Sequence, residues 1–501
     1  MDSTSRYIWA VVGVVGGAVV LKIVSKVLSA LRNRAKTVEG FPGPKTHWLL
    51  GNLDTLTNDE HGLTLMTSWS RLYRGVYALW FGPAMPVLVA YHPDTTQAIL
   101  SSNEPKDEGF YCFLRPWIGD GLLVSKGEKW ARTRRLLTKA FHFQVLQSYM
   151  EVFSQSTNVL LNKWRQLDGD HAAVELYKDT SLLTLESLTK CIFGVNINCQ
   201  DTDVSHPYAT AVLDMLVLMN QRLLFVPHHN DLIYYFSLSG YRFRRACRVA
   251  HDFSRKVVRE RQLAKQSGVT DDQRKTKYLS MIDILLEARD EDGTGLSNDE
   301  IFDEVDTFMF EGHDTTACGL SWLLHNLATH PECQEKCRRE AIDVLGSRST
   351  LEWEDLPKLQ YISQCLKESL RLHPPVPFVA RRAANGVSFA DGRRAPNGVG
   401  IVVDINSTHR NPDLWPDPEV FDPERFAPDK VEKRPPFSYI PFSAGYRNCI
   451  GQQFAQNQMK TAVALILKNF ELTHDASRPP VRDPKFVLRS KTGLWVHLKQ
   501  L

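Results

Sequence analysis

The sequence predicts a mainly α-helical protein with small β-sheets, preceded by an amino-terminal transmembrane helix. Three observations support this prediction. Helical periodicity dominates from residue 97 to residue 470. Strand-like alternation is confined to short runs, at 76–81 and 85–90 and again around 387–403 and 486–498. The amino end contains an apolar segment long enough to cross a bilayer.

The apolar segment runs from Tyr7 to Leu21 and continues to Leu31. Arg6 precedes it, whereas five cations lie toward or beyond its end, at Lys22, Lys26, Arg32, Arg34 and Lys36. This asymmetry predicts that the rest of the chain is cytosolic. A cleaved signal peptide is the alternative, but no small-x-small cleavage pattern follows the segment. With no Gly/Ser-rich linker or internal repeat, we expect an anchor with a basic flank over residues 1–36 and one large domain over residues 37–501.

Charge and cysteine content exclude several classes of protein. The 60 Lys and Arg residues nearly balance the 57 Asp and Glu residues, so the net charge of +3 does not favour nucleic-acid binding. The nine cysteines are scattered and contain no CxxC pair, which argues against a zinc site of that type. We therefore expect mostly free thiols in a reducing compartment.

A long central helix is predicted to begin at Ser297. Ser297 and Glu300 have the spacing of a capping box, and no proline interrupts the pattern before Pro331. The helix can therefore run for about 30 residues, or about 45 Å. Acidic, glycine and hydroxyl residues over 311–316 interrupt its apolar character, and such local conflicts tend to mark functional sites.

The most informative motif contains Phe442, Gly445, Arg447, Cys449 and Gly451, followed by an apolar helical pattern. A thiolate at the start of a helix is stabilised by the helix dipole and by backbone N–H groups, which suits it to bind a metal. A single cysteine is more often a small buried hydrophobe. Five specified positions at fixed spacing favour the ligand instead. The spacing resembles the haem-binding signature of cytochromes P450, in which Cys449 would ligate the iron.

This resemblance implies further haem contacts. Trp130 and Arg134 match the WxxxR motif, whose indole N–H and guanidinium bind haem propionates in the family. Arg381 occupies another position where the family places a propionate-binding cation. Phe442, Arg447 and Gly451 would belong to the loop that binds haem b.

Glu368 and Arg371 match the ExxR motif of the family, and Arg425 can complete a network with them. An isolated ExxR pair is usually a solvent-exposed ion pair. Here the pair precedes His373 and lies upstream of Cys449, as it does in the family. The resemblance therefore implies that Glu368, Arg371 and Arg425 stabilise the core behind the haem.

Gly312, Asp314 and Thr315 match the oxygen-activation motif of the family. The resemblance implies that Gly312 opens space for O2, while Asp314 and Thr315 deliver protons as an acid and an alcohol. The alternative for Thr315 is a hydroxyl group bonded to its own helix.

Glu311 narrows the resemblance to P450 family 4, which commonly has Glu in the context EGHDTT. An unpaired carboxylate there would be costly to bury. The resemblance implies that Glu311 forms an ester with a haem methyl group. A protonated or water-linked core Glu is the alternative.

Nearly the whole chain is similar to the F subfamily of family 4, including residues 105–111 and 116–121. The resemblance implies a membrane-bound monooxygenase of the endoplasmic reticulum, which hydroxylates fatty acids or eicosanoids at or near the ω carbon. NADPH-cytochrome P450 reductase would supply electrons, with cytochrome b5 as a further partner. Tyr446 departs from the proline that the family usually has in the haem loop.

Phe110, Phe113 and Trp117 match the substrate-lining loop, although core packing is the alternative for such a cluster. A basic stretch lies where the family docks its reductase, and it comprises Lys126, Lys129, Arg132, Arg135 and Lys139. Two other functions stay open: a lipid peroxide isomerase of the P450 type, and a haem-binding protein without catalysis. The pair of Asp314 and Thr315 favours oxygen insertion over both.

Overall fold

The computed structural model describes residues 38–82, 85–167, 172–201, 206–266, 280–289 and 295–501, together with residues 17, 21, 22, 25, 29 and 293. The expected anchor over residues 1–36 thus lies almost wholly outside the described residues. Within these ranges, no helix combines the length and the apolar character that a bilayer span requires.

Helices make up most of the described chain, as the sequence predicts. They are α2 (Glu60–Leu72), α3 (Pro93–Leu100), α4 (Glu108–Tyr111), α5 (Arg115–Ile118), α6 (Gly127–Thr138), α7 (Phe143–Ser148), α8 (Met150–Arg165), α9 (Leu176–Leu188), α10 (Pro207–Leu224), α11 (Asp231–Phe236), α12 (Leu238–Gln266), α13 (Met281–Glu287), α14 (Asn298–Thr329), α15 (Pro331–Leu345), α16 (Gln360–Leu372), α17 (Ile405–Thr408), α18 (Pro428–Glu432) and α19 (Gln452–Asn469). Short helical turns that bear on the site are η1 (Cys112–Leu114), η5 (Val226–His229), η7 (Pro423–Phe426) and η8 (Gly445–Arg447).

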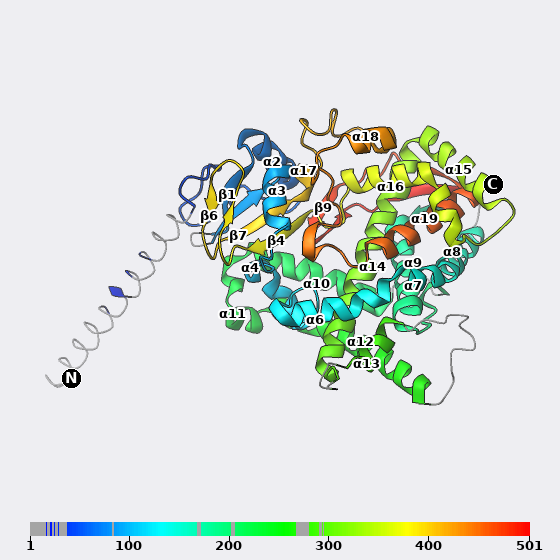
Figure 1. Ribbon diagram of the computed structural model, residues 1–501, viewed down its shortest axis with the longest axis horizontal. Helices are drawn as coiled ribbons and strands as arrows, with labels where there is room; N and C mark the ends of the chain where they lie inside the picture. Colours follow the sequence, from blue (N-terminus) through cyan, green and yellow to red (C-terminus); the bar gives the residue numbers. More distant parts are fainter. Residues whose placement is uncertain are drawn as a thin grey trace.

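The strands form small sheets at the edge of the helical body (Figure 1). They are β1 (Val76–Trp80), β2 (Pro86–Ala90), β3 (Ala172–Glu175), β4 (Phe378–Arg382), β5 (Val387–Ser388), β6 (Arg394–Ala395), β7 (Gly400–Asp404), β8 (Phe470–His474), β9 (Arg482–Lys485), β10 (Val487–Ser490) and β11 (Trp495–Gln500). The largest sheet has the order β1-β2-β7-β4, in which β2 and β7 run parallel and the other pairs run antiparallel.

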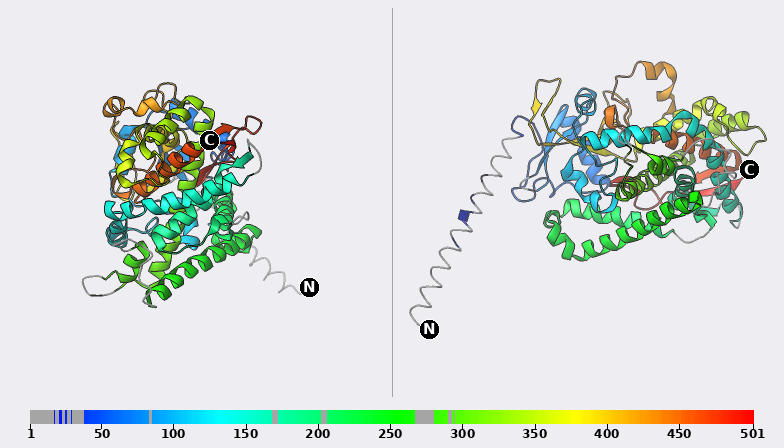
Figure 2. Two further views of the ribbon diagram at one scale, coloured as in Figure 1. Left: turned by 90° about the vertical axis from the view of Figure 1, so that its right-hand side faces the viewer. Right: turned by 60° about the horizontal axis from the view of Figure 1, so that its bottom comes forward.

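Helix α14 is the long helix that the sequence predicts. Its capping box is present: Ser297 Oγ accepts a hydrogen bond from Glu300 N at 3.2 Å, and Glu300 Oε2 accepts one from Ser297 N at 2.9 Å. The helix extends for 32 residues and packs against α9, α12, α16 and α19. In Figure 1, α10, α11 and α12 lie on one side of α14, and α16 lies on the other. Figure 2 shows α12, in green, at the surface of the body on the first of these sides. Helix α14 therefore crosses the centre of the body.

All nine cysteines are free, as expected from their scattered positions. Eight of them lie in or near the core, and Cys337 Sγ and Cys365 Sγ approach to 3.5 Å without forming a disulfide. Cys449 is the only one of the nine that is exposed, and its exposed side chain lines a cavity inside the protein.

Candidate active site

A cavity of about 310 Å3 brings the carboxyl-terminal loop that contains Cys449 together with the middle of α14. Apolar side chains form most of its wall. They come from several elements, including Leu188 of α9, Leu223 of α10, Phe310 of α14 and Phe486 between β9 and β10. Such a wall suits an apolar or flat aromatic ligand.

The loop that carries Cys449 is held in place by its backbone. Cys449 N donates a hydrogen bond to Phe442 O at 3.0 Å, which closes the loop around the short turn η8. Gly445 has a φ of 70°, and a Cβ at this position would lie 1.9 Å from Leu100 O. Only glycine fits there. Helix α19 begins directly after Gly451, so Cys449 lies just before a helix start, with its Sγ toward the cavity.

The Cys449 thiol is enclosed by protein, and burial together with the nearby Glu311 carboxyl raises its pKa to about 11. The Gly451 N–H and the cations Arg134 and Lys106 act in the opposite direction. A metal cation would displace the thiol proton, because the thiolate is the form that binds metals.

Two arginines flank the Cys449 loop, and the sequence motifs predict that both contact a cofactor anion. Arg134 of α6 donates hydrogen bonds to Asn448 O at 3.0 Å and to Asn448 Oδ1 at 2.8 Å. Arg447 donates to Ser125 O at 2.9 Å, and its guanidinium lies 4.4 Å from the centre of the Trp130 ring. Trp130, Arg134 and Arg447 all line the cavity, as do Phe442 and Gly451.

Arg381 and Lys106 lie beside this cluster on paired backbone segments. Arg381 is fully buried and donates a hydrogen bond to Ala380 O at 3.1 Å, while its Nε and Nη2 have no hydrogen-bond partner among the described residues. Lys106 Nζ lies 3.4 Å from the Tyr111 hydroxyl, and burial and the nearby Arg381 and Arg447 lower the pKa of Lys106 well below its usual range. Sequence reasoning missed Lys106, although it lies within the family-like segment 105–111.

These residues fit a haem. Arg381 does not itself line the cavity, but its unpartnered Nε and Nη2 atoms can donate to an anion beside Lys106, and Arg134 and Arg447 place positive charge on the cavity wall. Among the described residues that line the cavity, Glu311 is the single carboxylate. Two propionates would offset this excess of positive charge. Cys449 would hold the haem iron through its thiolate, a ligand that favours O–O cleavage.

Glu311, Gly312 and Thr315 of α14 line the cavity opposite the Cys449 loop. Burial raises the pKa of Glu311 to about 7, while Lys106 opposes this shift. Thr315 Oγ1 donates a hydrogen bond to Glu311 O at 2.6 Å. The hydroxyl group is thus bonded to its own helix, which is the alternative to proton delivery. A Cβ at Gly312 would lie 2.5 Å from Leu188 Cδ1. Gly312 thus makes room for Leu188, rather than only opening space for a small ligand.

Asp314, predicted to be a proton-delivering acid, lies behind the cavity wall. Its carboxylate is fully buried and absent from the cavity wall. It accepts a hydrogen bond from the Tyr177 hydroxyl and pairs with Arg489 of β10. The pairing is a tertiary feature, and neither partner stands out in the sequence.

Of the three aromatic residues predicted to contact substrate, Phe110 lines the cavity, whereas Phe113 and Trp117 do not. Phe113 packs against the His229 ring at 5.7 Å and lies under the Arg222 guanidinium at 4.6 Å. Trp117 is fully buried, with its ring centre 4.5 Å from that of Phe310. Core packing, which is the alternative for this aromatic cluster, describes both.

Glu368, Arg371 and Arg425 form one buried network. Arg371 Nε and Nη2 each lie 2.7 Å from a Glu368 oxygen, and Arg425 Nε lies 3.4 Å from Glu368 Oε1. Arg371 also donates to His409 O and Pro418 O. The network therefore joins α16 to the chain that leads into the Cys449 loop.

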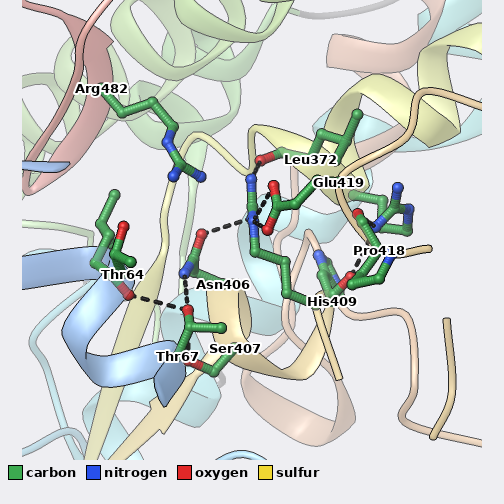
Figure 3. Close-up of polar contacts among 12 residues, drawn as sticks. Thr64, Thr67, Leu372, Asn406, Ser407, His409, Pro418, Glu419 and Arg482 are labelled. Atoms are coloured by element: carbon green, nitrogen blue, oxygen red, sulfur yellow. Dashed lines mark hydrogen bonds and ion pairs between the residues drawn. The ribbon is translucent and has the colours of Figure 1, made fainter. Parts of the chain in front are cut away.

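A third arginine, Arg410, follows His409 in the chain and makes further buried contacts. Arg410 donates to Asn406 Oδ1 at 2.6 Å and to Leu372 O, and it pairs with Glu419 at 3.1 Å (Figure 3). Asn406 donates in turn to Thr67 Oγ1 of α2 at 3.3 Å. These contacts fix α2, α16 and α17 relative to one another.

The basic stretch around α6 is partly neutralised within the chain. Lys126 pairs with Glu108, Lys129 pairs with Asp120 at 3.0 Å, and Arg132 pairs with Glu300 at 3.2 Å. Arg135 and Lys139 are exposed and form no ion pair with a described residue.

Comparisons with known proteins identify the family of this chain. The family model of cytochrome P450 matches residues 41–497. Cytochrome P450 4F12 of Homo sapiens is 43% identical over 98% of this chain and 96% of its own length. Leukotriene-B4 omega-hydroxylase 3 of Mus musculus is also 43% identical, over the same shares of the two chains. The ultra-long-chain fatty acid omega-hydroxylase of Homo sapiens is 45% identical over 92% of this chain and 88% of its own length. The chain therefore belongs to the cytochrome P450 family and, within it, to the family 4 group that these relatives represent.

Proposed function

We propose that this P450 hydroxylates long-chain lipids, fatty acids or eicosanoids, at or near the ω carbon. The observation that carries the proposal is the single apolar cavity lined by both Cys449 and Thr315. Two relatives that cover most of the chain are named omega-hydroxylases, one of leukotriene B4 and one of ultra-long-chain fatty acids.

When bound, a haem supplies the reductive activation of O2 and the insertion of one oxygen atom into a C–H bond. The chain's own residues do the rest. The apolar wall excludes water and orients a hydrocarbon chain. The Thr315 hydroxyl, which donates to Glu311 O, keeps lone pairs with which it can accept a hydrogen bond from a water molecule in the cavity. It can therefore position a proton donor inside the cavity, on the side formed by α14.

The central test uses the sulfur ligand. We expect the ferrous carbonyl adduct of the holoenzyme to show the red-shifted Soret band that a thiolate imposes, and Cys449→His to lose that band. With NADPH and reductase, the holoenzyme should form terminal alcohols, which product analysis across fatty acids of different lengths would detect. Retention of the band in Cys449→His, or products oxidised only at internal carbons, would contradict the proposal.

The same assay separates two other functions. Asp314 lies outside the cavity wall, so its presence no longer distinguishes oxygen insertion from peroxide isomerisation. An isomerase would convert lipid peroxides without NADPH or reductase, and a non-catalytic protein would bind haem without turnover. We expect product formation to require NADPH, O2 and reductase together.

We propose that Glu311 attaches the haem covalently. Its carboxyl lines the cavity with a raised pKa of about 7, so a neutral ester suits this environment better than an ion. The ester would replace one hydrogen of a haem methyl group with a Glu311 oxygen, a two-electron oxidation that turnover with O2 can supply. After acid treatment and organic extraction, we expect haem to remain with the protein. It should be extracted from Glu311→Ala but not from Glu304→Gln, a matched change on the same helix outside the cavity wall.

We propose that the reductase docks on the basic stretch around α6. Arg134 of the same helix contacts Asn448, so this surface lies next to the loop that carries Cys449. Because Arg135 and Lys139 lack an internal ion partner, Arg135→Gln and Lys139→Gln should raise the KM for reductase more than Lys129→Gln does. The increase should shrink at high salt. An equal effect of all three changes would argue against specific docking here. Cytochrome b5 is proposed to compete for the same surface.

We propose that the protein resides in the endoplasmic reticulum membrane through residues 1–36, with residues 37–501 on the cytosolic side. Exposed apolar side chains support a membrane-facing surface, including Phe236 at 79% exposed and Trp48 at 80%. Gly82 lies between the segment that contains Trp48 and the segment that leads to Phe236. Its N–H donates a hydrogen bond to Leu50 O, and a Cβ on Gly82 would lie 3.2 Å from Val226. The two segments with exposed apolar side chains therefore adjoin. Full-length protein should stay with carbonate-washed membranes. Release of the full-length protein by carbonate would contradict an integral anchor.

A further inference from the structure

Asn220 is a polar side chain on an apolar wall. It lies on α10 and lines the cavity together with Leu223 and Leu224, which follow at the i+3 and i+4 positions on the same helix face. The residue is 8% exposed. Its side chain forms no hydrogen bond with a described residue. The amide therefore faces the cavity with its donor and acceptor groups available.

Local forces do not favour asparagine at this position. Asparagine is a weak helix former, and an amide buried without a partner loses its hydrogen bonds to water. Leucine would suit both the helix and the wall. Buried polar groups in folded proteins nearly always have a partner, so an unpaired amide aimed into a ligand cavity indicates that the ligand provides one.

A second amide lies on the same wall, in a residue that is half-buried as a whole. Asn58 Nδ2, just before α2, is buried, lines the cavity and has no hydrogen-bond partner among the described residues. Helices α2 and α10 both contact β9, whose Pro484 also lines the cavity. Asn58 and Asn220 therefore lie on the wall around β9, on elements that carry neither Cys449 nor Glu311.

The charged residues of the cavity lie elsewhere. Within the described chain, no Lys, Arg, Asp or Glu of α2, α10 or β9 lines the cavity. The lining cations are Lys106, Arg134 and Arg447, which interact electrostatically with Glu311 beside the Cys449 loop. An ionised carboxylate at the amides would therefore lose its hydration without gaining a cationic partner. An uncharged oxygen does not incur that cost.

We propose that Asn220, assisted by Asn58, is a specificity-determining residue that hydrogen-bonds an uncharged oxygen of the substrate. Because an amide both donates and accepts, it matches a hydroxyl group or an ester or amide carbonyl. The substrate class is then a long-chain lipid that bears a neutral oxygen function in addition to its reactive hydrocarbon end. This proposal rests on the proposed lipid hydroxylation and narrows its substrate.

Binding titrations on the full-length holoenzyme test the proposal. The probes are a saturated long-chain alcohol, the acid and the alkane of the same chain length, followed through the change in the haem Soret spectrum. We expect the alcohol to bind about tenfold more tightly than the alkane, the size of effect that one or two neutral hydrogen bonds give. Asn220→Leu should reduce this ratio to about twofold without weakening alkane binding. Asn58→Leu should reduce it in part.

Two comparisons decide the outcome. Leu224→Ala, on the same face of α10, should weaken binding of all three probes by a similar factor. If Asn220→Leu does the same, or if the ionised acid binds more tightly than the alcohol and loses that advantage in Asn220→Leu, the proposal is overturned. The position of the oxidised carbon is determined in a separate experiment, by product analysis. Loss of the alcohol preference in Asn220→Leu would support this inference even if the oxidised carbon proved internal.

Discussion

Arg489 of β10 and Asp314 of α14 form a buried ion pair that holds the Asp314 carboxylate outside the cavity wall. The Tyr177 hydroxyl donates a further hydrogen bond to the same carboxylate. Burial lowers the pKa of Arg489. The negative charge of Asp314 raises it by more, so the pKa of Arg489 lies above its usual value. The pair thus ties the central helix to the β9–β10 hairpin.

Removing one partner of this pair should destabilise the fold. In Arg489→Met the Asp314 carboxylate stays buried without its cation, which should cost about 3–5 kcal/mol of unfolding free energy. Urea unfolding of the haem-loaded protein measures this cost. Lys499→Met is the control, because Lys499 pairs with Glu471 at the surface and should cost at most about 1 kcal/mol. Equal costs would show that Asp314 is not held by Arg489.

Gly312 and Leu188 should be energetically coupled. A methyl group at Gly312 would meet Leu188 Cδ1 at 2.5 Å, so Gly312→Ala forces the leucine to shift and should cost about 1–3 kcal/mol. Leu188→Ala removes the clash. In a double-mutant cycle followed by thermal unfolding, Gly312→Ala should cost clearly less in the Leu188→Ala background. Simple additivity would contradict a direct contact.

The two glycines of the Cys449 loop should respond differently to alanine. At Gly445 a Cβ would lie 1.9 Å from Leu100 O with φ at 70°, whereas at Gly451 the nearest atoms are 3.9 Å and 4.0 Å away. Gly445→Ala should therefore distort the loop and lose most bound haem, while Gly451→Ala should retain the larger share. Haem absorbance per protein after purification measures the difference. Equal retention would refute the steric argument.

Glu304 should make stability depend on pH. Burial raises its pKa to about 8 in the folded protein, although its hydrogen bond from Leu122 N opposes this. The folded pKa lies above the unfolded value, so the associated stabilisation is complete below about pH 4 and is lost as pH rises through about 8. Relative to Glu304→Gln, the natural chain should lose up to about 1.4 kcal/mol per pH unit between about pH 5 and 7. Denaturant unfolding at several pH values measures this. Parallel pH profiles would rule out a buried neutral Glu304.

Local patterns account for what the sequence predicts well. The capping box at Ser297 and the strands near residues 76 and 400 depend on neighbours in the chain, and the structure has them where expected. The Cys449 signature also depends on local spacing, because its glycines permit one particular turn. These features need no knowledge of the packing between distant segments.

Side-chain direction needs that knowledge. Successive residues of a helix point about 100° apart, so Asp314 leaves the face that Glu311 and Thr315 share. Trp117 and Phe113 likewise face the core because of what packs on them. Lys106 is an ordinary lysine in the sequence and becomes a site residue only because its segment pairs with the one that carries Arg381. No periodicity reveals such placements.

The parallel pairing of β2 with β7 joins segments about three hundred positions apart, as Val89 faces Val402. Both residues line the cavity, so its wall cannot close until most of the polypeptide has left the ribosome. Contacts between such distant segments form slowly, so the segments that are synthesised first expose apolar surface until β7 is available. Prosthetic-group insertion is therefore a late event in biosynthesis, and nascent chains should depend on chaperones until it occurs.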